Sequence, residues 1–295
     1  LQLRMSATRP QAPLPLLHSV EQPTLEVAKA LLRYPGIRLN VVTGGPGVVR
    51  EALDAGKKAI TAGPGNPPAV VDETADLEKA ARDIVAGASL DNNIICTDEK
   101  EVVAVSLIAD RLKEACARSG AVVLPPHQVE QLRKLLLEEE RGPRKVAIIN
   151  RRFVGKNVDV ILREVGIPCD PAKRIALCEV DADHPFVWTE MMMPVLPMVR
   201  VRSVDEAIDY ALLVEHGFRH TASMHSRNIE KLSKMARLCD CSIFVKNGPN
   251  FAGLGYGGEG PTSFTIASPT GEGMTTARSF TRLRRCTLVD AFRIV

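Results

Sequence analysis

Cys96 lies in a polar segment, DNNIICTDEK at residues 91–100, between a pair of asparagines and a run of charged residues. Most cysteines are buried as small hydrophobic residues, and Cys96 taken alone also fits that description. A polar loop, however, gives a thiol the partial access that a nucleophile needs, whereas a core strand does not. We therefore interpret Cys96 as a candidate nucleophile for covalent catalysis.

Two further segments hold groups that could bind a nucleotide. The sequence TGGPG at residues 43–47 separates an expected strand from an expected helix, where Gly44 and Gly45 would let the backbone approach a phosphate. It is neither a Walker A motif nor GxGxxG, so an ordinary strand-to-helix turn is the alternative. Glu190 precedes the apolar run MMMP, where a carboxylate could bind the two hydroxyls of a ribose. The alternative for Glu190 is a surface carboxylate at the entry to a strand.

The remaining cysteines and histidines predict no metal site. The tripeptide CDC at residues 239–241 supplies two soft ligands, whereas a closed zinc site needs about four. His184, His220 and His225 fall on different expected elements, and we interpret them as structural, with a catalytic role left open for His220. The seven cysteines are odd in number and irregular in spacing, which is typical of reduced thiols in a cytosol-like compartment.

Composition limits the classes of function. The chain has 295 residues, enough for two ordinary domains or one large one, and 45% of them are apolar. Its 38 Lys and Arg residues balance 35 Asp and Glu residues, and only 4% are aromatic, which argues against nucleic-acid binding. No apolar run reaches the roughly 18 residues that a membrane-spanning helix needs. No signal peptide is evident. We therefore predict a cytoplasmic location.

Strands and helices alternate from residue 19 onward, and this pattern predicts parallel βαβ units in an α/β fold. Residues 1–18 are expected to form an irregular tail. Residues 128–140 are expected to form one charged helix on an outer face, and Pro197 places the strand at 196–201 at a sheet edge or at a strand start. The other expected strands are 39–43, 58–62, 69–71, 102–105, 221–225 and 242–245, with a strand-like end at 284–295; the other expected helices are 25–34, 48–55, 77–89 (capped by Asp76), 106–117, 157–165, 204–215 and 228–238.

Six segments resemble the CoA-acylating aldehyde dehydrogenases, most of all the propionaldehyde dehydrogenase branch associated with bacterial microcompartments. They are DNNIICTDEK, TEMMMPVLP, HTASMHSRNIEKLSKMA, SIFVKNGPNFAGLGYGGEG, SPTGEGMTTAR and RRCTLVDAFRIV. The resemblance covers residues 19–295 and implies an aldehyde dehydrogenase-like α/β fold, truncated at the N-terminus. It implies a remnant of the Rossmann-like cofactor domain at 19–64, a catalytic domain at 65–265, and a C-terminal return with an oligomerisation strand at 266–295.

The resemblance also implies roles for individual residues. Cys96 matches the family's nucleophile, Glu190 matches the carboxylate that binds the nicotinamide ribose, and Thr43, Gly44 and Gly45 match the turn beside the cofactor diphosphate. The implied reaction oxidises a short aliphatic, propionaldehyde-like substrate to acyl-CoA with NAD, with NADP as the alternative cofactor. The implied partners are the aldehyde, CoA, further copies of the chain and a microcompartment, with no metal, nucleic acid or membrane.

Ala62 marks a departure from the wider superfamily. Hydrolytic aldehyde dehydrogenases resemble ELGGKSP where this chain reads AGPGNPP at residues 62–68, so Ala62 takes the position of their glutamate. A methyl group cannot accept a proton from water, so the acyl-enzyme is expected to persist until a thiol such as CoA attacks it.

Other classes of function stay open. Ala62 disfavours a hydrolytic aldehyde dehydrogenase, and a generic nucleotide-binding module would leave Cys96 unexplained. Because family members extend further at the N-terminus, the main alternative is a catalytically impaired, truncated subunit or a non-enzymatic partner of the intact enzyme.

Overall fold

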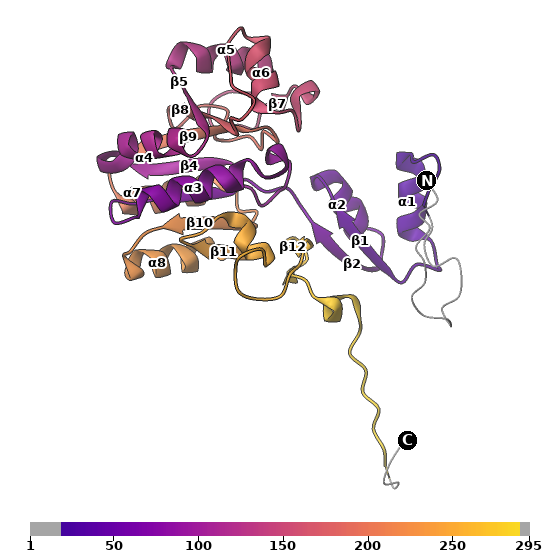
Figure 1. Cartoon of the computed structure of the whole chain (residues 1–295). Helices are drawn as coiled ribbons and strands as arrows, with labels where there is room; N and C mark the ends of the chain where they lie inside the picture. Colours follow the sequence, from indigo (N-terminus) through magenta and orange to yellow (C-terminus); the bar gives the residue numbers. More distant parts are fainter. Residues whose placement is uncertain (1–18, 290–295) are drawn as a thin grey trace.

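A seven-stranded sheet forms the centre of the computed structural model, which describes residues 19–289 (Figure 1). The strands lie in the order β11-β10-β3-β4-β9-β8-β5, and every adjacent pair is parallel. The predicted α/β class is therefore confirmed. The strands are β3 (Pro68–Val71), β4 (Glu101–Val105), β5 (Ala121–Leu124), β8 (Ile175–Glu179), β9 (Val195–Val201), β10 (Thr221–His225) and β11 (Ile243–Lys246).

Helices connect the strands, as parallel pairing requires. In α3, buried apolar residues recur at helical spacing (Ala80, Ala81, Ile84, Val85), and this face packs into the main core. The predicted N-cap of α3 is confirmed, because the Asp76 carboxylate accepts a hydrogen bond from the backbone N–H of Lys79 at 3.1 Å. The helices around the sheet are α3 (Leu77–Ala88), α4 (Ser106–Arg118), α5 (Pro126–Leu136), α6 (Val158–Glu164), α7 (Val204–Val214) and α8 (Ile229–Cys239).

The first part of the described chain forms a smaller unit. Strand β1 (Leu39–Thr43) lies parallel to β2 (Lys58–Ala62), with Thr43 opposite Ala62. Helices α1 (Leu25–Arg33) and α2 (Pro46–Leu53) accompany them, and Figure 1 shows this unit beside the seven-stranded sheet. Its apolar side chains remain partly exposed because two strands give little surface for burial.

Residues 128–140 do not form the single outer helix that the charge pattern predicts. Helix α5 ends at Leu136, and β6 (Leu137–Glu139) pairs antiparallel with β7 (Ile148–Ile149). The helix is also less solvated than expected, because Val129, Leu132 and Leu136 are buried in a second core. The many charged residues of this segment conceal that apolar stripe in the sequence.

Pro197 is not at a sheet edge, because β9 lies between β4 and β8. It is the third residue of the strand, opposite Cys178 of β8. Pairing with β4 begins only at Met198, so proline stands just before that ladder starts. This placement explains how a residue without an N–H is accepted inside the sheet.

Short elements complete the described chain. Strands β12 (Ile266–Ala267) and β13 (Gly273–Met274) form an antiparallel pair, and the 3-10 helices are η1 (Leu90–Asn93), η2 (Arg151–Phe153), η3 (Asn250–Leu254) and η4 (Ala277–Phe280). Of the strand expected at 284–295, residues 284–289 are described and hold no strand, while 290–295 and the tail predicted at 1–18 lie outside the described residues. Between residues 19 and 289, no helix has the length and apolar character for a membrane span.

Candidate active site

The loop that carries Cys96 begins with a sharp reversal of the backbone after α3. Asp91, Asn92 and Asn93 have φ angles of 44°, 53° and 66°. This left-handed region is one that Asn and Asp adopt more readily than other non-glycine residues. The DNN sequence therefore suits the backbone of η1, a role that polarity alone did not reveal.

Two buried side chains hold this loop closed. The Asn93 amide donates to two backbone carbonyls, one at the end of α3 and one just before β4, at 2.8 and 3.0 Å. The Lys100 ammonium donates to the Asn93 carbonyl at 2.7 Å, the Asn93 side-chain oxygen at 2.9 Å and the Ile95 carbonyl at 3.0 Å. All three Lys100 donors are thus satisfied by the backbone and side chain immediately before Cys96.

The charged residues after Cys96 are buried, although the sequence suggests an exposed polar turn. Asp98 accepts from the N–H of Ile95 at 3.2 Å, and Glu99 accepts from the N–H of Asn250 at 2.8 Å. Burial raises the pKa of Asp98 to about 7 and that of Glu99 to about 8. The segment therefore forms the packed foundation of the loop and not its surface.

Cys96 itself is half-buried. Burial raises the pKa of its thiol to about 11, the negative charge of Glu190 adds to that rise, and the Lys100 ammonium opposes it. The thiol is therefore mostly protonated at neutral pH, and it must lose its proton before it can act as a nucleophile. The influence of Glu190 also shows that the structure brings these two predicted site residues together.

Alkylation should report this raised pKa directly. The rate at which iodoacetamide modifies Cys96 follows the thiolate fraction, so we expect it to rise about tenfold per pH unit from about pH 7 to about pH 10. Mass spectrometry of the tryptic peptide 83–100 would measure this rate, because that peptide contains no other cysteine. Free cysteine in the same buffers serves as the control, and a plateau for Cys96 near the pKa of the free thiol would contradict the prediction.

Gly65 lies where three parts of the site meet. Burial raises the pKa of Glu190, and the Lys100 charge and a hydrogen bond from the Gly65 N–H oppose that rise. A Cβ atom at Gly65 would stand 2.5 Å from the carbonyl oxygen of Cys96 and 3.1 Å from Cγ of His220. Only glycine lets these segments approach so closely.

His220 is the functional candidate that the sequence left open. Its side chain is buried, its Nδ1 lies 2.8 Å from the Thr221 hydroxyl, and its Nε2 has no hydrogen-bond partner among the described residues. Burial, with a further contribution from Lys100, lowers its pKa to about 4. The imidazole is therefore neutral at physiological pH, and the Cγ and Nδ1 side of its ring packs against Gly65.

The turn at Thr43, Gly44 and Gly45 lies at the end of β1 and leads into α2. The Gly44 N–H donates to the Ala62 carbonyl at 3.0 Å, and Gly45 is the N-cap of the helix. Neither glycine has a positive φ, so the backbone conformation does not require them. A Cβ at Gly45 would meet nothing within 4 Å, which leaves open space in front of the helix N-terminus. Pro46 has no N–H and the Val48 N–H donates to the Gly45 carbonyl at 3.1 Å, so in the first turn of the helix this space and the Gly47 N–H are what could receive a phosphate group.

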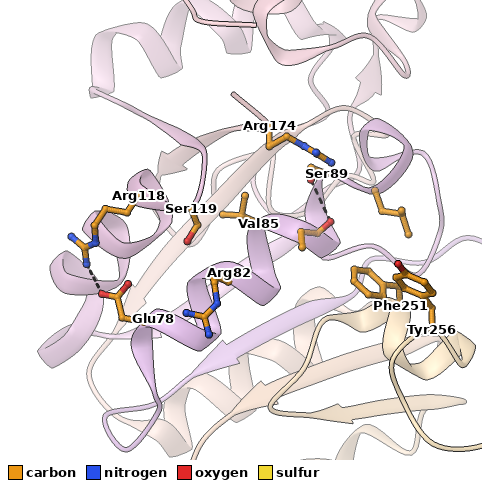
Figure 2. A pocket seen from close by; sticks show the side chains of 11 residues that line it. Glu78, Arg82, Val85, Ser89, Arg118, Ser119, Arg174, Phe251 and Tyr256 are labelled. Carbon is orange, nitrogen blue, oxygen red and sulfur yellow. Dashed lines mark hydrogen bonds and ion pairs between the residues drawn. The ribbon is translucent and has the colours of Figure 1, made fainter. Parts of the chain in front are cut away.

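A surface pocket of about 570 Å³ lies elsewhere, between α3, α4 and η3 (Figure 2). Arginine and aromatic side chains line it, and Arg118 is paired with Glu78 at 2.5 Å. None of the predicted site residues contributes to its lining. We therefore assign this pocket no part in the chemistry of Cys96.

The chain is similar to known aldehyde dehydrogenases. The aldehyde dehydrogenase family matches residues 5–123. The chain is 53% identical over 283 residues to the acetylating acetaldehyde dehydrogenase of Salmonella typhimurium, covering 95% of this chain and 60% of that protein. The chain is homologous to the CoA-acylating aldehyde dehydrogenases. It spans about three-fifths of the length of the curated relatives that it matches.

Solved structures of related proteins show the same fold. The propionaldehyde dehydrogenase of Rhodopseudomonas palustris, with bound CoA and an acylated cysteine, has a TM-score of 0.86 and 50% identity over 91% of this chain and 60% of that one. A propionaldehyde dehydrogenase from the Clostridium phytofermentans fucose utilisation microcompartment has a TM-score of 0.87 and 42% identity over 92% of this chain and 61% of that one. These matches confirm the aldehyde dehydrogenase-like fold.

Proposed function

We propose that this chain carries the catalytic centre of a CoA-acylating aldehyde dehydrogenase, which converts a short aliphatic aldehyde, CoA and NAD to acyl-CoA. The observation that carries this proposal is the meeting of Cys96, Glu190 and His220 around Gly65. Homology to acetylating and propionaldehyde-oxidising dehydrogenases supports the choice of substrate.

Cys96 begins the reaction by attacking the aldehyde carbon, which forms a carbon–sulfur bond and an oxyanion. Its thiol proton must first pass to a base. With a pKa of about 4, the His220 imidazole is too weak a base to hold a proton taken from a thiol whose pKa is about 11, so it could accept that proton only as the sulfur attacks the aldehyde carbon. The backbone N–H of Cys96 already lies close to its own sulfur. It can therefore donate a hydrogen bond to the oxyanion that forms on the attached carbon.

The residues on the chain fit a dinucleotide. Thr43, Gly44 and Gly45 offer the open helix N-terminus to the diphosphate, and the Glu190 carboxylate can accept hydrogen bonds from the nicotinamide ribose. When bound, the nicotinamide supplies the hydride acceptor that turns the aldehyde adduct into a thioester. The turn is exposed to solvent, so a dinucleotide can reach it.

Ala62 explains why the thioester on Cys96 would be hydrolysed slowly and would persist until CoA attacks it. Its methyl group lies at the end of β2, almost fully buried, and provides no base for water. The CoA thiol then attacks the thioester carbon, and the Cys96 sulfur leaves as the acyl group moves to CoA. This exchange of one thioester for another makes the kinetics ping-pong.

Mass spectrometry can test this function directly. Incubation of the chain with propionaldehyde and NAD should add one propionyl group to peptide 83–100, and CoA should then remove it and yield propionyl-CoA. Omission of NAD is the matched control, because without a hydride acceptor no thioester forms. A peptide that stays unmodified while the folded chain binds NAD would contradict the proposal.

Substitution of Ala62 should redirect the acyl group to water. In Ala62→Glu, the carboxylate takes the position that the resemblance assigns to the general base, so we expect hydrolysis relative to CoA transfer to rise about a hundredfold. The ratio of propionate to propionyl-CoA, measured by chromatography, checks this. Ala62→Gln is the control of similar size that lacks the base, and an equal ratio in the two variants would rule out our interpretation of Ala62.

We further propose the organisation that the resemblance implies. Residues 19–64 belong to the cofactor-binding part, 65–265 to the catalytic domain, and 266–295 to a return segment used between copies of the chain. The separate β1–β2 pair supports the first division. Association with a microcompartment is supported by the origin of one related structure, and a homo-oligomer is what the resemblance implies.

A further inference from the structure

Cys239 and Cys241 face each other across a tight turn that the proposed reaction does not use. Asp240, between them, ends α8 in a left-handed conformation with φ 43° and ψ 39°. This turn brings the two side chains so close that a hydrogen bond from the Cys239 thiol reaches the Cys241 sulfur. Two thiols two residues apart are thus held together by the backbone before any reaction takes place.

The two sulfur atoms have different surroundings. Cys239 is 6% exposed and belongs to the main core, whereas Cys241 is half-buried and so can be reached from solvent. As a thiol, Cys241 donates to the Ile243 carbonyl at 2.9 Å. As a thiolate, it can accept from the Cys239 thiol and from the backbone N–H groups of Cys241 and Ala222.

These donors favour the thiolate of Cys241. The hydrogen bond from Cys239 is the largest cause that lowers the Cys241 pKa, and burial and the charge of Glu215 oppose it. The same bond raises the pKa of Cys239, which stays a thiol. A half-buried thiol with a lowered pKa beside a second thiol is the arrangement that reacts with oxidants and then forms a disulfide.

We propose that Cys239 and Cys241 form a modification site, a dithiol that peroxides oxidise reversibly to a disulfide within the turn. In the first step the Cys241 sulfur attacks one peroxide oxygen, the O–O bond breaks, and hydroxide leaves, so that Cys241 becomes a sulfenic acid. In the second step the Cys239 sulfur attacks Cys241, the S–O bond breaks, and water leaves with the proton of Cys239. The protein loses two electrons and two protons, and the peroxide gains them.

The dithiol and the proposed nucleophile lie on different segments of the chain. Ser242, which follows the turn, and Ile243, the first residue of β11, donate their backbone N–H groups to the carbonyls of Arg219 and His220 at 2.9 and 3.1 Å. The backbone around the turn is therefore fixed on the strand side, while Cys96 lies in the loop before β4. Reaction at the dithiol and reaction at Cys96 can consequently be followed on two different peptides.

Peroxide titration of the full, reduced chain tests the proposal. Trypsin releases Cys239 and Cys241 together in peptide 238–246, which holds no other cysteine, and Cys96 in peptide 83–100. After hydrogen peroxide and then an alkylating agent, we expect peptide 238–246 to lose two hydrogens and remain unalkylated. Half-conversion should need about tenfold less peroxide than oxidation of Cys96 does. Dithiothreitol should restore both alkylation sites.

Phenylarsine oxide gives a second measurement that needs no variant. It bridges two neighbouring thiols, so one molecule per chain should protect peptide 238–246 from alkylation. Cys239→Ser and Cys241→Ser should each abolish both the disulfide and this protection, whereas Cys169→Ser, which changes another half-buried thiol, should leave both unchanged. The proposal would be overturned if peroxide oxidised wild-type Cys241 only to sulfinic or sulfonic acid. It would also be overturned if Cys96 were oxidised at lower peroxide concentrations than the dithiol.

Discussion

Cys96→Ser is expected to abolish formation of acyl-CoA, with kcat reduced at least about a thousandfold. A serine hydroxyl is far less acidic than a thiol, and the half-buried site already raises the pKa of the thiol to about 11. The alkoxide would therefore be almost absent, and an ester would exchange with CoA much more slowly than a thioester does. Absorbance of NADH formed from propionaldehyde and CoA measures the loss.

The control for this variant is Cys169→Ser. Cys169 is also a half-buried free thiol, but it packs in the second core, among the side chains of α5 and α6. It should retain the wild-type rate, and both variants should unfold at the same urea concentration as the wild type. If Cys96→Ser kept more than a tenth of the activity, another nucleophile would have to be sought.

Local sequence patterns were sufficient to predict most elements of the fold. The runs PAVV and VVAV become β3 and β4 because a parallel sheet covered on both faces accepts continuous apolar residues. The caps Asp76 and Asn228 act on the helix that follows each of them, so the sequence alone shows where those helices begin.

The inner surroundings of the site could not be predicted in this way. Gly65, Cys96 and His220 are far apart in the sequence, and only the packed sheet brings them together. The sequence TDEK after Cys96 has the composition of an exposed turn, yet its residues are buried, and one hydrogen bond each to Asp98 and Glu99 offsets only part of the cost of burying them. The propensity of a segment for a helix, a strand or an exposed turn depends on its own residues. Its burial depends on which other parts of the chain pack over it.

Lys100 links these buried charges to the nucleophile. Burial lowers its pKa, and the charges of Glu190, Asp98 and Cys96 oppose that change. It therefore stabilises negative charge in the site while its three hydrogen bonds hold the backbone before Cys96. The same residue thus affects both the position of the sulfur and the pKa of its thiol.

Lys100→Met is accordingly expected to lower the free energy of unfolding by about 3–5 kcal/mol. Methionine has a similar length and is apolar, so the variant removes the charge without leaving a large cavity. The carbonyls of Asn93 and Ile95 would lose their donor, and the nearby carboxyl groups would lose their cation. The pKa of Cys96 should also rise further, because Lys100 is the charge that opposes its rise.

Urea unfolding and alkylation of peptide 83–100 would measure these two effects separately. Lys134→Met is the matched control, because Lys134 lies 3.6 Å from Glu130 on α5 with 72% of its side chain exposed, and such a pair contributes less than about 1 kcal/mol. A purely structural Lys100 would lower stability but leave the pH dependence of alkylation unchanged in the fraction that remains folded. A parallel loss of stability and of thiolate at a given pH is the result that assigns Lys100 both roles, because the buried ammonium group both donates to the backbone before Cys96 and opposes the rise in the pKa of its thiol.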